Sequence, residues 1–159
     1  LEGKESHPEW LDVELEVIPG ISAMQAGASR VGAMLGHDFC TISLSDLLTP
    51  WETILKRIEK AGEGDFVVSF YNPVSKKRDW QLNKPRDILL QHRPASTPVL
   101  LGRQLTRPEE SVRIIRLDEL DAKDVDMFTL VSVGNSESRH IINGSKEWIY
   151  TPRGYKKKL

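Results

Sequence analysis

The sequence predicts an α/β domain in which a mixed sheet is flanked by helices. Strand-like and helix-like hydrophobic periods alternate along its 159 residues, and this length suits one domain with a sizeable core. The run Asp65–Tyr71 is continuously apolar at its centre, which is typical of an interior strand covered on both faces. The formal net charge of -1 gives no overall attraction to nucleic acid or to an anionic membrane surface.

The chain divides into a linker, a domain and a tail. We expect residues 1–10 to be an N-terminal extension or interdomain linker, residues 11–155 to be the domain, and residues 156–159 to be a basic tail. No apolar run approaches the length of a bilayer span, and no signal-peptide pattern opens the chain. A cytoplasmic protein is therefore the expectation.

The first elements are predicted to be a strand and a helix. Apolar and acidic residues alternate over Asp12–Val17, which predicts a half-buried strand. Pro19-Gly20 breaks the strand, and Ser22 caps a helix that runs to about Leu35. Gly36 is expected to stop this helix. The small residues of the helix allow close packing against a sheet or a ligand, although Ser22 could equally be only a cap.

The middle of the chain predicts a buried strand over Cys40–Leu44 and then a second helix. Thr49 and Glu52 have the spacing of a capping box, with Pro50 at the first helical position. Gly62 is expected to end this helix. Apolar residues at helical spacing supply its buried side; they are Ile54, Leu55 and Ile58.

The second half of the chain predicts one further helix and several strands. The helix covers about Trp80–His92, with Pro85 kinking it or confining it to the residues that follow. An acidic connection, with at most a short helical turn, covers Asp118–Asp126. The predicted strands are Thr97–Leu101, Ser111–Leu117, which can pair antiparallel with its predecessor, Phe128–Val133, and an edge strand near Trp148–Tyr155.

A structural metal is not predicted. The single cysteine, Cys40, lies in an apolar run and cannot form an internal disulfide, so we expect a buried, unreactive thiol. The histidines show no metal-ligand spacing with one another or with Cys40; they are His7, His37, His92 and His140.

Four turn motifs each follow the end of a predicted strand. They are Pro19-Gly20, Tyr71-Asn72-Pro73, Gly102-Arg103-Gln104 and Gly134-Asn135-Ser136. Open α/β sheets bind ligands beyond the carboxyl ends of their strands, so we expect these turns to form one rim around a small-molecule site. The alternative is four ordinary turns, since Gly, Asn and Pro are common turn residues.

Several sequence motifs, taken together, resemble those of the tetrapyrrole methylase family of cobalamin biosynthesis. They are Val17–Ala23, Gly36–Phe39, Ile42–Trp51, Phe70–Pro73, Val125–Met127, Val133–Ser136 and Thr151–Tyr155. The Pro-Gly-Ile-Ser-Ala element is shared across the family. Ser43–Trp51, Tyr71–Pro73 and Thr151–Tyr155 resemble the branch that methylates C17 of precorrin-3B. The similarity runs from about Val13 to Tyr155.

The resemblance implies two α/β domains that hold S-adenosylmethionine in the cleft between them, and a homodimer. It implies methylation at C17 of precorrin-3B or its cobalt analogue, with ring contraction. This chain matches the second domain. The first domain, with its Gly-Pro-Gly and acidic Gly-Asp-Pro elements, has no counterpart before Leu11, so we expect the chain to be inactive alone.

The same resemblance implies cofactor contacts that are made mostly by the backbone. They are Ser22 and Ala23 toward the methionine moiety or adenosine, Tyr71 and Asn72 toward the adenine, Leu105 toward the base, and Asn135 and Ser136 closing the region. Relatives often carry a smaller residue at the position of Leu105.

Methyl transfer from an activated sulfonium depends on positioning and desolvation, so no catalytic triad is expected. Ring contraction would benefit from an acid or base, for which Asp46, Ser45 and His37 are candidates; capping or turn hydrogen bonds are the alternative. Cationic side chains that could pair with substrate carboxylates are Lys76, Lys77, Arg78, Arg103 and Arg107. The lysines could equally belong to a solvated loop.

Two other functions fit the same residues. The chain could be a tetrapyrrole-binding or dimerisation module without catalysis. It could also belong to another methylase of the family, acting on uroporphyrinogen, another precorrin carbon or diphthine. The sequence leaves these alternatives open.

Overall fold

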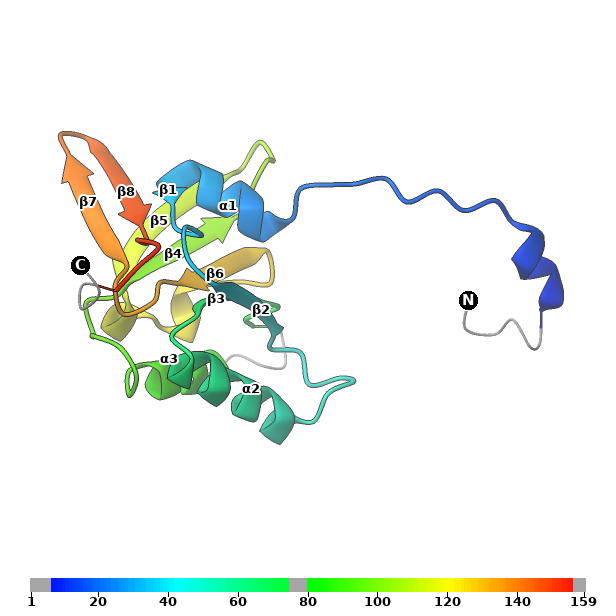
Figure 1. The fold of residues 1–159 in the computed structure, drawn as a ribbon, viewed down its shortest axis with the longest axis horizontal. Coiled ribbons are helices and arrows are strands. Elements are labelled where there is room, and N and C mark those ends of the chain that lie inside the picture. Colours follow the sequence, from blue (N-terminus) through cyan, green and yellow to red (C-terminus); the bar gives the residue numbers. More distant parts are fainter. Residues whose placement is uncertain (1–6, 75–79, 156–159) are drawn as a thin grey trace.

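Two mixed sheets and three α-helices form the body of the protein in a computed structural model that describes residues 7–74 and 80–155 (Figure 1). The five-stranded sheet has the order β2 (Phe39–Ser43), β3 (Val67–Tyr71), β6 (Thr129–Val133), β4 (Pro98–Arg103) and β5 (Ser111–Arg116). The three-stranded sheet has the order β1 (Gly32–Ala33), β8 (Lys146–Tyr150) and β7 (Arg139–Asn143). The helices are α1 (Ala23–Val31), α2 (Trp51–Glu63) and α3 (Asn83–Leu89), with 3₁₀ turns η1 (Pro8–Asp12), η2 (Leu117–Glu119) and η3 (Ala122–Asp124).

The predicted fold class is confirmed, and strand direction makes the main sheet mixed. β2 and β3 are parallel, β6 is antiparallel to both β3 and β4, and β5 is antiparallel to β4, as its sequence allowed. The small sheet was not predicted, and β7 was missed entirely. The strand near the C-terminus, β8, lies in the middle of that small sheet rather than at an edge.

Helices cover the main sheet on both faces. α2 and α3 lie on one face, where Ile54 and Ile58 pack in the same core as Phe70. The other face carries α1 and the small sheet, and there Leu100 packs with Ile149. Among the described residues no helix has the length and apolarity needed to cross a membrane.

The strands of the main sheet begin or end along two opposite sides of the sheet, which are named here after one residue each. The side where β2, β3 and β4 end and β6 begins is called the Tyr71 edge. The opposite edge, where β6 ends and β2, β3 and β4 begin, is the Asn135 edge. Inside the sheet the hydroxyls of Ser69 and Ser132 pair at 2.7 Å, which satisfies both buried groups.

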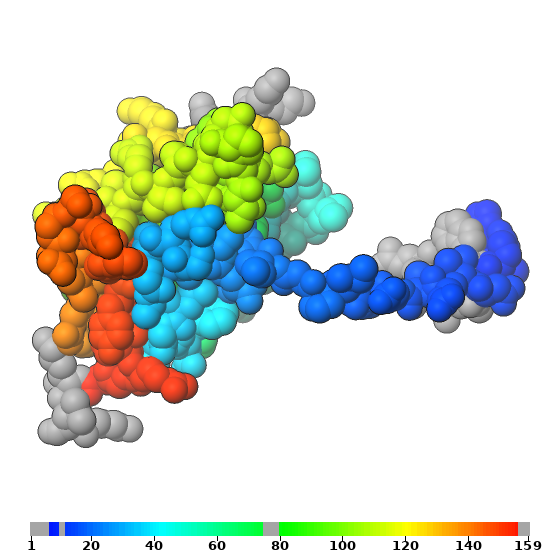
Figure 2. All heavy atoms as spheres, turned by 90° about the horizontal axis from the view of Figure 1, so that it is seen from above, coloured from blue at the N-terminus to red at the C-terminus, as the bar shows by residue number. Residues whose placement is uncertain are grey.

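The strand predicted over Asp12–Val17 is wrong. This segment is extended but pairs with no strand among the described residues, and it leads away from the body (Figures 1 and 2). Its apolar side chains are exposed, from 57% at Val13 to 93% at Val17. Alternation describes a face that can be buried, but a strand also needs a neighbour for its hydrogen bonds.

Two helix boundaries differ from the prediction. α1 stops at Val31 because Gly32 adopts a φ of 107°, where its N–H bonds the carbonyl of Ala28; Gly36 is not the stop. The capping box at Thr49 is also wrong, since α2 has Pro50 as its N-cap and no side-chain cap. α2 continues through Gly62 to Glu63.

Other expectations need smaller corrections. β2 is an edge strand in which Ile42 alone is fully buried, so the predicted buried strand is half exposed. Pro85 lies in the first turn of the shortened α3, where a missing N–H costs no helical bond. β3, predicted as an interior strand, is confirmed, with Val67 to Phe70 buried. The predicted basic tail, residues 156–159, lies outside the described residues, as do residues 1–6 of the predicted linker.

Candidate functional site

The N-terminus of α1 lies at the Tyr71 edge and is capped as predicted. Ser22 and Gln25 form a reciprocal capping box in which the Ser22 N–H donates to Gln25 Oε1 at 2.9 Å. The Met24 N–H donates to the Tyr71 hydroxyl at 3.0 Å, which joins the helix to the end of β3. Within the described part of the chain, the Ala23 N–H is the one first-turn amide left without a partner.

A glycine lets α1 approach the sheet closely. A Cβ at Gly27 would lie 2.9 Å from a Leu130 methyl, 3.1 Å from one of Leu100 and 3.2 Å from one of Leu105. The side chain of Leu105 therefore packs directly against the helix. This contact brings the loop after β4 onto α1, where both can line one site.

The loop over residues 104–110 has an unusual backbone. Gln104 and Thr106 both have positive φ angles, 47° and 67°, which are uncommon for residues with a side chain. Leu105 lies between them, and among the described residues its N–H and C=O make no hydrogen bond to the protein. The loop thus presents a free backbone donor and acceptor.

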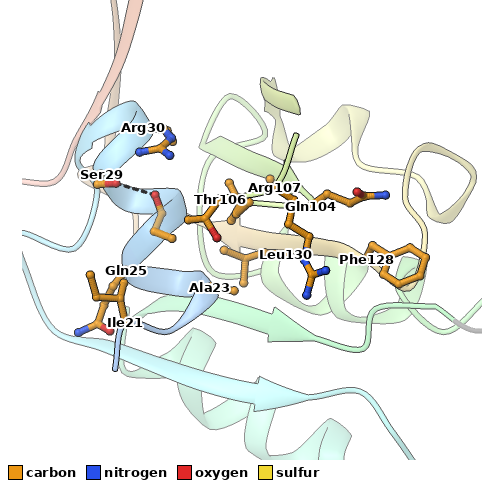
Figure 3. Close-up of a pocket in the computed structure, with 13 residues that line it drawn as sticks. Ile21, Ala23, Gln25, Ser29, Arg30, Gln104, Thr106, Arg107, Phe128 and Leu130 are labelled. Atoms are coloured by element: carbon orange, nitrogen blue, oxygen red, sulfur yellow. Dashed lines mark hydrogen bonds between the residues drawn. The ribbon is translucent and has the colours of Figure 1, made fainter. Parts of the chain in front are cut away.

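The helix and the loop enclose a pocket of about 960 Å³. Figure 3 shows side chains of α1 on one side and of the loop and β6 on the other. The pocket is lined by Ile21, Ala23, Gln25, Ala26, Ser29, Arg30, Gly102, Gln104, Leu105, Thr106, Arg107, Phe128 and Leu130. Its volume is in the range of small-molecule sites, and its floor is apolar.

Some of the predicted cofactor residues meet here. Ala23 and Leu105 line the pocket, while Ser22 caps the adjoining helix and Tyr71 holds its first turn. Asn72 follows the same strand, has a φ of 52°, and donates to the Ser43 hydroxyl at 3.1 Å, away from the pocket lining.

The predicted rim of four loops is wrong in two parts. The turn Pro19-Gly20 follows no strand among the described residues. Because β6 runs antiparallel to β3 and β4, the turn after β6 lies at the Asn135 edge, not with the other turns. There Ser136 donates through its N–H and its hydroxyl to Asp65, and Asn135 Oδ1 accepts from the Glu137 N–H and the Ser138 hydroxyl.

The catalytic candidates are divided between the two edges. Ser45 and Asp46 follow β2 at the Tyr71 edge, and Asp46 Oδ2 accepts from the buried Gln81 at 3.0 Å. His37 precedes β2, so it lies at the Asn135 edge. There its ring packs edge-to-face against that of Tyr155, with the two ring centroids 5.3 Å apart. None of the three candidates lines the pocket. The expectation that they flank one strand end is therefore wrong for His37.

The predicted cationic residues also differ in their surroundings. Arg103 Nε donates to Asp126 Oδ2 at 2.7 Å, so its charge is already paired. Burial opposes the charged form of Asp126, but hydrogen bonds from Thr129 and Arg103 outweigh it and lower its pKa. Arg107 lines the pocket, is exposed, and forms no ion pair among the described residues. Lys76, Lys77 and Arg78 lie outside the described residues.

Residues 5–121 match the family model of the tetrapyrrole (corrin/porphyrin) methylases, which is most of the chain. The chain belongs to the tetrapyrrole methylase family. It is 49% identical over 148 residues to precorrin-3B C(17)-methyltransferase of Sinorhizobium sp, covering 92% of this chain and 58% of that protein. It is 48% identical over 145 residues to a probable cobalt-factor III C(17)-methyltransferase of Salmonella typhimurium, covering 91% and 58%.

A solved structure of the same family agrees in fold. The crystal structure of the methyltransferase CobJ matches with a TM-score of 0.85 and 41% identity, over 95% of this chain and 62% of that one. A cobalt precorrin-4 methyltransferase, at 14% identity and a TM-score of 0.61, shares the fold. The chain thus spans about three fifths of the length of these methyltransferases, 58% of the Sinorhizobium protein and 62% of the CobJ chain.

Sequence reasoning missed several residues of this tetrapyrrole methylase pocket. Arg30 and Glu110 form an ion pair beside it, and Phe128 and Leu130 supply apolar walls. The pairing of Arg30 with Glu110, 80 positions apart, has no local signal. Gly27, in a helix rich in small residues, was the one available hint of a close contact. Cys40, expected to be buried, is only half-buried, and this burial raises the pKa of its thiol.

Proposed function

We propose that this chain is the cofactor-binding part of an S-adenosylmethionine-dependent methyltransferase that methylates C17 of precorrin-3B or its cobalt analogue, with ring contraction, in cobalamin biosynthesis. The observation that carries this proposal is the pocket between α1 and the loop 104–110. Ala23 and Leu105 line it, and among the described residues the Ala23 N–H and the Leu105 N–H and C=O form no hydrogen bond. Similarity to the C17-methyltransferases supports the substrate class.

The residues of the pocket fit the cofactor. The Ala23 N–H lies at the positive end of α1, which suits the carboxylate of the methionine moiety. The Leu105 N–H and C=O suit the edge of the adenine base, and Phe128 and Leu130 offer apolar surface to its ring. S-adenosylmethionine supplies an activated methyl group, so the work of these residues is to hold it in line and to exclude water.

A tetrapyrrole would meet apolar and cationic groups at the same edge. Exposed apolar side chains follow β2 and precede β6 there; they are Leu47, Leu48, Met127 and Phe128. Such a patch suits a large, flat macrocycle or another domain of the same protein. Arg107 forms no ion pair among the described residues and can pair with a substrate carboxylate, whereas Arg103 must first leave Asp126.

We infer that this site is completed by a domain N-terminal to the chain in the whole protein. The exposed apolar segment Val13–Ile18 suits pairing with such a domain, and the partial coverage of the relatives supports it. Homodimer formation and a cytoplasmic location stay predictions.

Calorimetry and product analysis test the proposal. A full-length protein carrying this domain should bind S-adenosylhomocysteine, and mass spectrometry should detect one added methyl at C17 of precorrin-3B. This chain alone should show no micromolar binding; if it binds that tightly, the shared-site argument is wrong. Methylation of uroporphyrinogen, another precorrin carbon or diphthine would reassign the substrate. Binding of tetrapyrrole without any methyl transfer would leave only a binding module.

A further inference from the structure

The backbone of the loop over residues 104–110 is held in a conformation it would not choose alone. Thr106 is β-branched, and a φ of 67° for such a residue is a true outlier. Strained backbone of this kind persists only where the surrounding structure determines it, and it is concentrated at ligand sites. The groups that hold Thr106 therefore matter for the adjoining Leu105.

One carboxylate holds the loop, and one arginine holds the carboxylate. Glu110 Oε2 accepts the Thr106 N–H at 2.6 Å. Arg30, in the last turn of α1, donates to the same carboxylate from Nε at 2.6 Å and from Nη2 at 3.2 Å. Two parallel bonds from a planar guanidinium fix both distance and orientation. We call these three residues the Arg30 clamp.

The clamp and the apolar packing act on the same short segment. The Leu105 side chain lies against Gly27 in the middle of α1, while Glu110 is tied to Arg30 one turn further along. The loop is thus fixed to the helix at two places, and the backbone of Leu105 lies between Gln104 and the clamped Thr106. Both of these hydrogen bonds from Arg30 go to Glu110, so Arg30 Nε and Nη2 donate within the protein rather than toward the pocket.

We propose that Arg30 and Glu110 are positioning residues that hold the Leu105 backbone in place to bind the nucleoside end of the cofactor. They act through Thr106 and need not touch the ligand. This inference rests on the proposed function, because it requires that the pocket binds S-adenosylmethionine. Hydrogen bonds from Arg30 and from the Thr106 N–H lower the pKa of Glu110, because both bonds favour its charged form.

The test compares KM with kcat in a full-length protein that carries this domain. Glu110→Ala and Arg30→Ala should each raise KM for S-adenosylmethionine, and the dissociation constant of S-adenosylhomocysteine, between about tenfold and about a hundredfold, because this is roughly the affinity lost with the two backbone hydrogen bonds of Leu105. kcat at saturation should change much less. Glu110→Gln should fall between wild type and Glu110→Ala, since its amide oxygen can still accept the Thr106 N–H.

A matched control is the Lys60–Glu63 pair on α2, which is also exposed and has a 2.6 Å contact but lies outside the pocket. Lys60→Ala should leave KM and the dissociation constant unchanged. Hydrogen exchange of the Thr106 amide in each variant shows whether the loop was released. A released loop with unaltered ligand affinity would overturn the proposal. Failure of the wild type to bind S-adenosylhomocysteine would instead overturn the proposed function, and the clamp's role with it.

Discussion

The two edges of the main sheet carry similar turn residues, but the polar groups of these residues are bonded differently. At the Asn135 edge many polar groups bond to one another: Ser136 to Asp65, Asn135 to its own turn, and Ser138 to Thr151 at 2.7 Å. Four buried nitrogens there have no hydrogen-bond partner among the described residues; they are His37 Nδ1, Arg93 Nε, Arg93 Nη2 and Asn135 Nδ2. At the Tyr71 edge, Ala23 and Leu105 keep backbone groups unbonded beside a pocket. Residue type at a turn is therefore a poor guide to binding; unbonded groups of residues that line a pocket are the better guide.

Buried charge separates the edges further. Arg93 is 5% exposed at the Asn135 edge and donates to the carbonyl of Phe66 at 3.0 Å and to that of Gly134. Burial lowers its pKa, and the nearby Asp65 counters this. The cations of the Tyr71 edge, Arg30 and Arg107, are by contrast exposed to solvent. The charge of Arg93 is therefore shielded from solvent, whereas the charges of Arg30 and Arg107 are accessible.

The largest effect is expected from Arg93→Ala, which would open a cavity and leave two carbonyls without their donor. The free energy of unfolding should fall by about 3 kcal/mol, because two hydrogen bonds from a charged donor are lost, each worth roughly 1.5 kcal/mol or more. Urea unfolding would measure this. Arg113→Ala, at a side chain 57% exposed, is the control and should change it by less than about 0.5 kcal/mol. A loss below 1 kcal/mol, roughly one ordinary hydrogen bond, would contradict a stabilising role.

A smaller loss is expected at Asp65, which both accepts two hydrogen bonds from Ser136 and has a φ of 53°. Asp65→Ala should cost about 2 kcal/mol, and Asp65→Asn about 1 kcal/mol, since Asn tolerates this backbone and keeps one acceptor. Thermal unfolding of the two variants would measure the difference. Equal losses would mean that the φ angle and the remaining acceptor contribute nothing.

At the Tyr71 edge, Ser22→Ala should lower the free energy of unfolding by about 1 kcal/mol through loss of the helix cap. Thr49→Ala is its matched control, because Thr49 was expected to cap α2 but does not. Its effect should stay below about 0.5 kcal/mol. Denaturant titration of both variants would settle the comparison, and similar losses would show that the two positions cap alike.

The smallest effect is expected from the pH dependence of Glu110. Its pKa is below the usual 4.5 in the folded state, so the charged carboxylate favours folding at neutral pH. That contribution is lost as the pH falls through the folded-state pKa. The difference in Tm between wild type and Glu110→Gln should therefore be present at about pH 7 and vanish by about pH 2. A constant difference across this range would mean that charge is not its cause.

Local patterns determined much of the fold. The Ser22 cap, the interior strand ending at Tyr71 and the apolar face of α2 each follow from side-chain spacing within one element. The motifs around Pro19 and Asn72 also pointed to the tetrapyrrole methylases, and the family match confirms this. These features depend on neighbours a few residues apart, which a sequence displays directly.

Only the tertiary structure decided which of those motifs meet. Asn135 lies away from the pocket because β6 is antiparallel to its neighbours, and the segment Asp12–Val17 has no strand beside it in the part of the chain that the structure describes. The pairing of Arg30 with Glu110, and the positive φ of Thr106 that it holds, also appear only in the folded chain. Strand direction and distant ion pairs are set by contacts between segments, and hydrophobic spacing within a segment carries no record of them.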